Sequence, residues 1–463
     1  MVDEAIGAMR SGRSFLLMLV VAAGLGGYIY FVEMKRDPAA DTATTAREKV
    51  FTIQAGTIED VEITNATSQV VRVSRKDAVW SLVAPEAALG IEEADTAEVT
   101  TVISSLESLE RVKVIDENPA TVAPFGLAPA RIKVAFKTAG DATQKVLLIG
   151  NKTPTGGDLY AKLDNAPGVF LIGAFLEDTF NRKPFDLREK TALKFTRDAV
   201  DSITLAQGTT RVTLAKTGSD WRFSGPNGAR ADAAAVDALI GQLAQARMTS
   251  IAAADASAAK PAEYGLDKPQ VVATIGAGST KAELAIGKKE DDTHFFARDL
   301  SRPLVFGVDK TLLDELLKKA DDFRVKDVFA YRSFTATGMD VAFGGQAFTF
   351  AKKKAEGETS LEKWWQTVPA SKELESAKFD DFLMTMSNLR AESFAATAHT
   401  GGEAITITAR FGDAAAPQTE TVTLRKVGTV VHAIRAGEPG AAVVSTADFD
   451  RALGLFKELT SAK

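Results

Sequence analysis

The side chains that most often carry catalysis or metal binding are sparse in this sequence. It contains no cysteine and only three histidines, His294, His399 and His432. The lack of cysteine excludes disulfides, thiolate nucleophiles and cysteine metal sites. No Gly-x-Ser-x-Gly segment occurs, so there is no nucleophile elbow of the serine-hydrolase type. Because most catalytic proton shuttles and zinc sites use histidine, the chemistry open to the chain is narrow.

One short segment places acidic side chains next to a histidine. Glu290, Asp291 and Asp292 stand just before His294, and carboxylate and imidazole groups are the ligands that a weak metal site would use. Transition-metal sites need ligands that converge, however, and this is a single local cluster. The sequence therefore favours a charged surface turn over a metal site.

Two glycine-containing segments superficially resemble phosphate-binding loops, "IGNKTPTGGD" from Ile149 and "IGKKEDD" from Ile286. Neither has a Lys-Ser or Lys-Thr ending at the spacing of a P-loop, so we interpret both as solvated hairpin turns. Among the 61 acidic residues no pair stands out as a general acid and base. The sequence thus predicts no catalytic, cofactor-binding or metal-binding residues, no cofactor and no enzymatic activity.

Length and charge narrow the function classes further. At 463 residues the chain is too long for one core, which suggests about three domains. Hydrophobic residues make up 45% of the chain, enough to exclude a disordered tail protein. The net charge of −6 is spread over scattered acids and bases, so the sequence lacks the basic face of a nucleic-acid-binding protein.

A hydrophobic segment near the start predicts a membrane anchor. Residues 14–32, "SFLLMLVVAAGLGGYIYFV", carry no charge and as a helix would cover roughly 28 Å, enough to cross the hydrocarbon core. The alternative is a cleaved signal peptide, whose apolar region is shorter and ends in small residues. Since the apolar run continues past "GLGG", we expect a tail over 1–13, one transmembrane helix over 14–32 and a polar linker over 33–49.

The charges around the predicted anchor do not fix its orientation, because Arg10 and Arg13 precede it and Lys35 and Arg36 follow it. Long downstream domains translocate largely regardless of charge, and a short tail with one span is the usual layout for exporting the rest of a chain. We therefore expect a single-pass protein of the inner membrane with the bulk of the chain in the periplasm.

Small residues inside the predicted anchor are spaced four apart, which lets a second helix approach closely. The alternative is a span that is merely rich in small residues. The residues of this candidate packing surface are Ala22, Ala23, Gly26 and Gly27.

Three related tryptophan segments indicate an internal repeat: "WSLVAP" from Trp80, "WRFSGP" from Trp221 and "WQTVPA" from Trp365. We expect each tryptophan to close a strand meander by covering the helix that follows it. The alternative is an aromatic platform for a ligand.

The same apolar stripe, with helical spacing, follows each tryptophan segment. In the first copy Asp95 and Glu98 precede it as a predicted N-cap and capping-box pair. The stripe residues are Val99, Val102, Ile103, Leu106 and Leu109, then Val236, Leu239, Ile240, Leu243 and Ala246, then Phe379, Phe382, Leu383, Met386 and Leu389.

Two further markers recur. "PFGLAP" at 124–129 and "EYGLDKP" at 263–269 each place an aromatic residue before a glycine suited to positive φ, Gly126 or Gly265, and a proline that opens the next extended segment, Pro129 or Pro269. The third copy lacks this element. "DLREKTALKF" from Asp186 and "DFRVKDVFAY" from Asp322 mark where one unit ends and the next begins.

Short segments with period-two alternation fill the remainder of each copy, with helices between groups of strands. Hairpin spacing favours antiparallel pairing, because a parallel sheet needs a crossover helix after nearly every strand. The predicted fold is α+β: three tandem, mutually similar units of antiparallel sheet with inserted helices, over residues 50–190, 191–327 and 328–463.

The sequence resembles the bacterial family known as domain of unknown function 4340. The resemblance rests on the N-terminal anchor, the Trp80 segment, "FGLAP" and "YGLDKP", the "LLIGNK" and "LAIGKK" turns, "LYAKL" and "HFFAR", and "DLREK" and "DFRVK". It covers most of residues 50–330. It implies an anchored extracytoplasmic protein, often a companion of ABC-type exporters, and no catalytic or binding residues.

We therefore expect a non-enzymatic accessory or scaffold protein of an ABC-type transporter or another cell-envelope complex, with a transporter permease as a typical partner. Repeated units add contact area and reach without needing a pocket. Two alternatives stay open: a ligand- or glycan-binding protein that uses grooves between repeats, and an envelope hydrolase.

Overall fold

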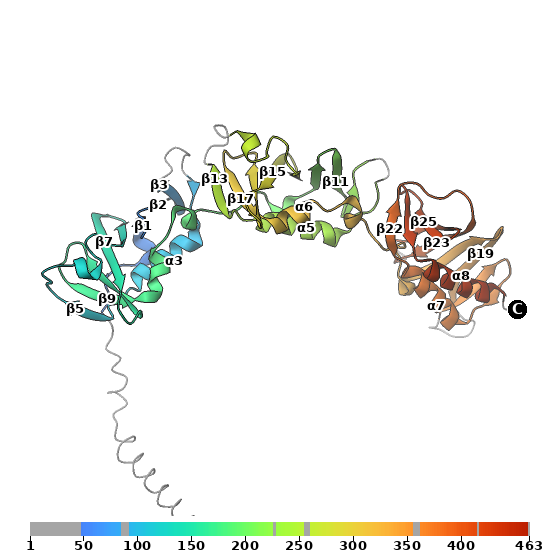
Figure 1. The fold of residues 1–463 in the computed structure, drawn as a ribbon. Helices are drawn as coiled ribbons and strands as arrows, with labels where there is room; N and C mark the ends of the chain where they lie inside the picture. Colours follow the sequence, from blue (N-terminus) through green and yellow to red (C-terminus); the bar gives the residue numbers. More distant parts are fainter. Residues whose placement is uncertain are drawn as a thin grey trace, which may run out of the picture. The chain divides into compact units, whose positions relative to one another are not determined.

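In the computed structural model, three antiparallel β-sheets with few helices follow one another along the chain (Figure 1). The structure describes residues 48–84, 92–225, 228–253, 260–354, 362–413 and 416–461. The predicted tail, the span 14–32 with Ala22, Ala23, Gly26 and Gly27, and nearly all of the linker lie outside these residues. Within them, no helix is long and apolar enough to cross a membrane.

The first sheet has nine strands in the order β4-β3-β2-β1-β6-β7-β8-β9-β5. Its elements are β1 (Ile58–Thr64), β2 (Val70–Lys76), β3 (Val79–Ala84), β4 (Glu92–Glu93), α3 (Thr96–Glu107), β5 (Lys113–Asp116), β6 (Ile132–Thr138), β7 (Asp141–Lys152), β8 (Asp158–Leu163), β9 (Val169–Gly173) and α4 (Glu177–Phe180), with the 3-10 turns η2 (Ala55–Thr57), η3 (Ala123–Phe125), η4 (Ala174–Leu176) and η5 (Pro184–Leu187).

The second sheet has eight strands in the order β12-β11-β10-β14-β15-β16-β17-β13. Its elements are η6 (Arg197–Ala199), β10 (Ser202–Gln207), β11 (Thr210–Thr217), β12 (Asp220–Phe223), α5 (Ala233–Gln245), β13 (Ser250–Ala253), η7 (Pro261–Glu263), β14 (Val271–Ala277), β15 (Thr280–Lys289), β16 (His294–Asp299), β17 (Val305–Asp309), α6 (Lys310–Leu316) and η8 (Ala320–Phe323).

The third sheet again has nine strands, in the order β21-β20-β19-β18-β23-β24-β25-β26-β22. Its elements are η9 (Ser333–Thr335), β18 (Ala336–Phe343), β19 (Gln346–Lys354), β20 (Glu362–Val368), β21 (Lys372–Glu373), α7 (Ser376–Ser387), β22 (Ala391–Ala395), β23 (Glu403–Phe411), β24 (Gln418–Val427), β25 (Val430–Arg435), β26 (Ala441–Val444) and α8 (Thr446–Ser461).

All three sheets share one topology, apart from the two-residue edge strands β4 and β21, which have no counterpart among the described strands of the second sheet. A three-stranded meander leads into a helix, the chain then forms a strand at the far edge, and a four-stranded meander and a second helix complete the unit. The far-edge strands are β5, β13 and β22. Antiparallel sheets with inserted helices were predicted, and this is confirmed, although the chain is mostly β.

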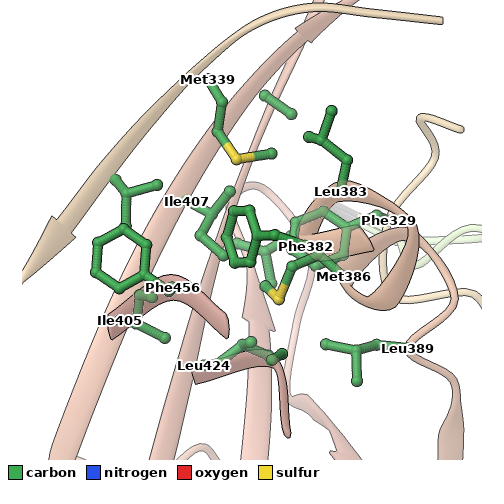
Figure 2. Close-up of a cluster of buried hydrophobic side chains, with 14 of the residues drawn as sticks. Phe329, Met339, Phe382, Leu383, Met386, Leu389, Ile405, Ile407, Leu424 and Phe456 are labelled. Atoms are coloured by element: carbon green, nitrogen blue, oxygen red, sulfur yellow. The ribbon is translucent and has the colours of Figure 1, made fainter. Parts of the chain in front are cut away.

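The predicted apolar stripes form the inner faces of α3, α5 and α7, and the last residue of each stripe lies just beyond the end of its helix. Every stripe residue is buried except Ala246, which is half-buried. In the third sheet, Phe382, Leu383 and Met386 of α7 gather with strand residues such as Ile407 and with Phe456 of α8 (Figure 2). Burying a Leu- or Phe-sized side chain stabilises the fold by about 1.5–3 kcal/mol, so the stripe holds each helix on its sheet.

The described part of the chain divides into two compact units between Glu189 and Lys190, so the second and third sheets share one unit. The predicted domain ranges 50–190, 191–327 and 328–463 stay predictions. Each sheet buries helix and strand residues on its own inner face.

The tryptophans that were predicted to have a core role differ in burial. Trp80 and Trp221 are buried, at 4% and 6% exposed, but in the third sheet the buried ring is Trp364, at 3%, whereas Trp365 is half-buried. Trp364 lies 4.7 Å from Phe379 of α7, measured between ring centroids. Successive strand residues face opposite sides of a sheet, so only one of two adjacent tryptophans can face the helix.

Backbone and side-chain contacts identify Trp364 as the equivalent of Trp80 and Trp221. The carbonyl oxygen of each accepts a hydrogen bond at 2.9 Å from the strand or segment that comes next in the chain. Each ring also lies under a cation from the neighbouring strand. The pairs are Arg75–Trp80 at 5.5 Å, Lys216–Trp221 at 5.4 Å and Lys352–Trp364 at 5.1 Å from cation to ring centroid.

The N-cap prediction for α3 is confirmed, but the capping box does not form. The Asp95 carboxylate accepts hydrogen bonds from the backbone N–H groups of Ala97 and Glu98. The Asp95 N–H donates to the Leu187 carbonyl at 2.8 Å, and the Glu98 carboxylate pairs with Arg182 at 3.0 Å. A tertiary contact thus takes the donor that a capping box would have used.

Candidate functional site

Each sheet has one loop that runs from the far-edge strand to the next central strand, and we call it the edge loop. Edge loop 1 spans 117–131, edge loop 2 includes the described residues 260–270, and edge loop 3 spans 396–402. The predicted glycines lie in the first two, and both have positive φ, 70° at Gly126 and 68° at Gly265. Pro129 and Pro269 follow them and precede β6 and β14.

Edge loops 1 and 2 press directly against strands β7 and β15. A Cβ atom on Gly150 would lie 2.1 Å from the Phe125 carbonyl oxygen, and one on Gly287 would lie 2.1 Å from that of Tyr264. These two glycines belong to the "IGNK" and "IGKK" segments, which we predicted to be solvated turns. The turns do form after β7 and β15 end. The two glycines, however, lie within the strands, where the absence of a side chain leaves room for the edge loop.

In each sheet an aromatic ring of the edge loop contacts the ring of the third residue of a strand, and the three strands, β8, β16 and β25, occupy equivalent places in their sheets. Phe125 lies 4.9 Å from Tyr160 of β8, and Tyr264 lies 5.0 Å from Phe296 of β16. In the third sheet the contact joins His399 to His432 of β25, whose rings stack at 3.7 Å with an interplanar angle of 12°. The third copy therefore keeps the contact although it lacks the aromatic-glycine motif.

A small cavity lined by arginines lies where the second and third sheets adjoin within the 190–463 unit. Its volume is about 30 Å³, room for a single water molecule or for one projecting polar group. The charged lining residues are Arg230, Arg324, Lys326, Asp327, Arg435 and Glu438. Four cations thus face two carboxylates.

Ion pairs and hydrogen bonds hold most of these groups in place. Arg230 Nε pairs with Glu438 at 2.7 Å, and its Nη2 donates to the Asp327 carbonyl at 3.1 Å. Arg435 bridges Glu438, at 3.3 Å, and Glu420. Glu420 in turn accepts hydrogen bonds from the backbone N–H groups of Ala330 and Tyr331. This network fixes the chain segment that joins the two sheets.

Arg324 is a half-buried arginine of the cavity that makes no ion pair within the described residues. Its guanidinium lies over the Phe394 ring at 4.0 Å and donates to the Pro439 carbonyl at 3.3 Å. Among the described residues, no carboxylate lies within ion-pair distance of it. Burial lowers the pKa of Arg324, and burial together with the nearby Arg435 lowers that of Arg230. Both effects favour an anion that would complete the charge balance.

The acidic segment around His294 forms a local turn. His294 Nδ1 lies 2.8 Å from an oxygen of Asp291, and its Nε2 lies 3.7 Å from Asp309. The hydrogen bond to Asp291 raises the pKa of His294 and in return lowers that of the Asp291 carboxyl. Among the residues that the structure describes, no three His, Asp or Glu side chains are arranged to hold a metal ion.

The predicted marker residues are spread over the three sheets and do not converge on one site. The sequence did not predict the cavity lined by arginines, which we call the arginine cavity, because Arg230, Arg324 and Arg435 lie far apart along the chain. One signal was present, since Arg324 belongs to the "DFRVK" junction motif.

A protein-family model matches most of the chain. The family described as "Domain of unknown function (DUF4340)" matches residues 80–222 and 221–406. No curated protein matches the chain.

Two solved structures from Pseudomonas aeruginosa are similar to the chain over most of its length. One is a DNA polymerase sliding clamp with ligand, with 10% identity and a TM-score of 0.13, covering 88% of this chain and 95% of that one. The other is a DnaN sliding clamp (DNA polymerase III subunit beta) bound to griselimycin, with 9% identity and a TM-score of 0.14 at the same coverage. Neither likeness supports an argument about fold or function.

Proposed function

The chain belongs to the DUF4340 family, and from this premise we propose that it is a non-enzymatic, membrane-anchored accessory or scaffold protein of the cell envelope. In this proposal residues 14–32 hold it in the inner membrane, the three sheets lie in the periplasm, and its partner is an integral membrane protein such as an ABC-transporter permease. The observation that carries the proposal is the triple use of one sheet topology, which multiplies similar surfaces along one chain.

Two exposed phenylalanines are the first places to look for such a contact. Phe175, in the η4 turn after β9, is 82% exposed, and Phe334, in the η9 turn before β18, is 81% exposed. Large aromatic side chains are enriched among the residues that dominate protein interfaces. Neither ring supports the core, so either can be replaced with little effect on folding.

Site-specific crosslinking in the native membrane tests the partner. A photo-reactive residue at Phe175 or Phe334 is expected to form an adduct with an integral membrane protein, and the same residue at the exposed Lys457 serves as the matched control. The Phe334→Ala and Phe175→Ala variants should then reduce co-purification of that protein without changing the circular dichroism spectrum. Adducts at Lys457 alone, or none with any membrane protein, would count against the scaffold role.

Membrane orientation has its own test. A reporter that is active only outside the cytoplasm, fused after Lys463, should be active in the natural chain and inactive in a variant that lacks residues 14–32. Activity in both variants would disprove the anchor, and inactivity in both would disprove the periplasmic location.

The arginine cavity favours a second candidate function, the binding of an anionic ligand such as an acidic glycan unit. Arg324 makes no ion pair with a carboxylate within the described residues, and planar guanidinium groups suit carboxylate and phosphate oxygens. Calorimetry of the full chain with galacturonic acid and inorganic phosphate is the test. Binding that is lost in Arg324→Gln but kept in Lys426→Met, which changes a distant lysine, would support this function. No heat in the natural chain would dismiss it.

A further inference from the structure

The third sheet holds its edge loop with two imidazole rings, where the first and second sheets use phenylalanine and tyrosine rings. Phe125–Tyr160 and Tyr264–Phe296 hold edge loops 1 and 2. His399 and His432 occupy the equivalent places in the third sheet, and their rings stack at 3.7 Å. Two imidazoles at this distance are compatible with stacking while uncharged, but two imidazolium ions would repel each other.

A hydrogen bond between loop and strand requires one of these rings to be unprotonated at a named atom. The backbone N–H of His399 donates to Nδ1 of His432 at 3.1 Å. Nδ1 can accept this bond only without its proton, so His432 must be the neutral tautomer that carries hydrogen on Nε2. Protonation at Nδ1 removes the acceptor and turns the contact into one between two donors.

The surroundings of His432 also oppose a positive charge. His432 is buried, at 5% exposed. Its cross-strand neighbour on β24 is Arg425, whose guanidinium donates to the carbonyls of Thr400 and Gly401 in the same loop at 3.5 and 3.4 Å. Its neighbour on β26 is Val443, which carries no charge. No hydrogen bond or ion pair joins a carboxylate to either ring anywhere in the described part of the chain.

We propose that the stacked His399–His432 pair is a pH-sensitive latch, which holds edge loop 3 against the third sheet near neutral pH and releases it in mildly acidic surroundings. Edge loops 1 and 2 stay closed under the same conditions, because their contacts contain no imidazole. Release would uncover the face of β25 around His432 and leave Arg425 without its two carbonyl partners in the loop. The inference does not depend on the proposed membrane partner.

The sign of the pH effect follows from the closed and open states. Burial, and then the neighbouring His399, hold the pKa of His432 below its ordinary value. The closed latch is therefore fully favoured above about pH 6.5 and loses stability as the pH falls toward the lowered pKa. If the open loop restores a pKa of about 6.5, the opening equilibrium should rise as the pH falls from 7.5 to 5.5, by at most about tenfold.

Hydrogen exchange of the full chain at the two pH values tests the latch, with each rate divided by the intrinsic rate at that pH. The protection factor of the His399 amide is expected to fall at pH 5.5, by up to about tenfold. The Lys288 amide, which donates to the Tyr264 carbonyl at 2.9 Å and reports on edge loop 2, is the internal reference and should not change.

Two substitutions remove the titrating ring. His432→Asn keeps an acceptor near the position of Nδ1, and His432→Tyr copies the residue found in the first sheet. Both should make the protection of edge loop 3 independent of pH, and the Asn variant decides the matter if the Tyr variant does not fold. A constant protection factor in the natural chain would overturn the proposal, and so would an equal fall in the Asn variant or at Lys288.

Discussion

Two adjacent tryptophans in β20 have different surroundings and should contribute differently to stability. Trp364 is buried against Phe379 of α7, whereas Trp365 is half-buried on the other side of the strand under Lys353, 5.8 Å away. Trp364→Ala should lower the free energy of unfolding of the third sheet by about 3–5 kcal/mol, because it leaves a cavity under the helix. Trp365→Ala should cost about 1 kcal/mol or less.

Urea unfolding followed by hydrogen exchange of the β18 and β23 amides measures the free energy of unfolding of the third sheet in both variants. Equal losses in the two variants would show that the assignment of Trp364 as the core ring is wrong.

A second residue-scale prediction concerns the turn between β15 and β16. The Asp291 carboxylate raises the pKa of His294 by accepting its hydrogen bond. The pair therefore stabilises the turn fully below about pH 6.5 and loses this effect as the pH rises through the raised pKa of His294. In a proton NMR titration the midpoint for His294 should lie above about 6.5 and should move down in Asp291→Asn. Asp292→Asn is the control, and an equal change there would contradict the assigned partner.

At the scale of elements, the three long helices that come after the meanders differ in how they begin. In α5 the Asp232 carboxylate accepts hydrogen bonds from the N–H groups of Ala234 and Ala235 at 2.9 and 3.2 Å. In α7 the equivalent Glu375 makes no side-chain cap. Asp232→Ala should therefore destabilise the second sheet by about 0.5–2 kcal/mol. Glu375→Ala removes only an exposed ion pair with Lys378 and should cost about 0.5 kcal/mol or less.

Thermal unfolding followed by circular dichroism gives both values, and the two variants form a matched pair at equivalent positions. A larger loss in Glu375→Ala than in Asp232→Ala would show that these caps do not set the stability of the helices.

The elements also show which parts of the fold local sequence determines. Period-two strands and the apolar helix stripes depend on neighbours within a few residues, so the antiparallel sheets and their helices were predictable. The far-edge position of β5, β13 and β22 was not, because a strand carries the same alternation at any place in a sheet. Edge loop 3 was missed because His399 replaces the aromatic-glycine motif, so only its contact with His432 reveals the equivalence.

At the scale of the whole molecule, the second and third sheets belong to one compact unit. The ion pairs that Arg230 and Arg435 make with Glu438 form the polar part of the junction between these two sheets. Arg230 precedes α5 of the second sheet, and Glu438 lies between β25 and β26 of the third. Their side chains are 19% and 15% exposed. Solvent screens such a pair only partly, so its loss should weaken the coupling between the two sheets.

We predict that Glu438→Gln separates the unfolding of these two sheets. In the natural chain, amides of β14 and β23 should lose protection at the same urea concentration, since one unit opens as a whole. The variant leaves Arg230 without its charged partner at a cost of about 1–3 kcal/mol, and two transitions should appear. Lys426→Met is the control, because the Lys426–Asp450 pair lies within the third sheet and bridges no junction. A single shared transition in Glu438→Gln would mean that apolar packing alone couples the sheets, whereas two transitions already present in the natural chain would mean that the network does not couple them.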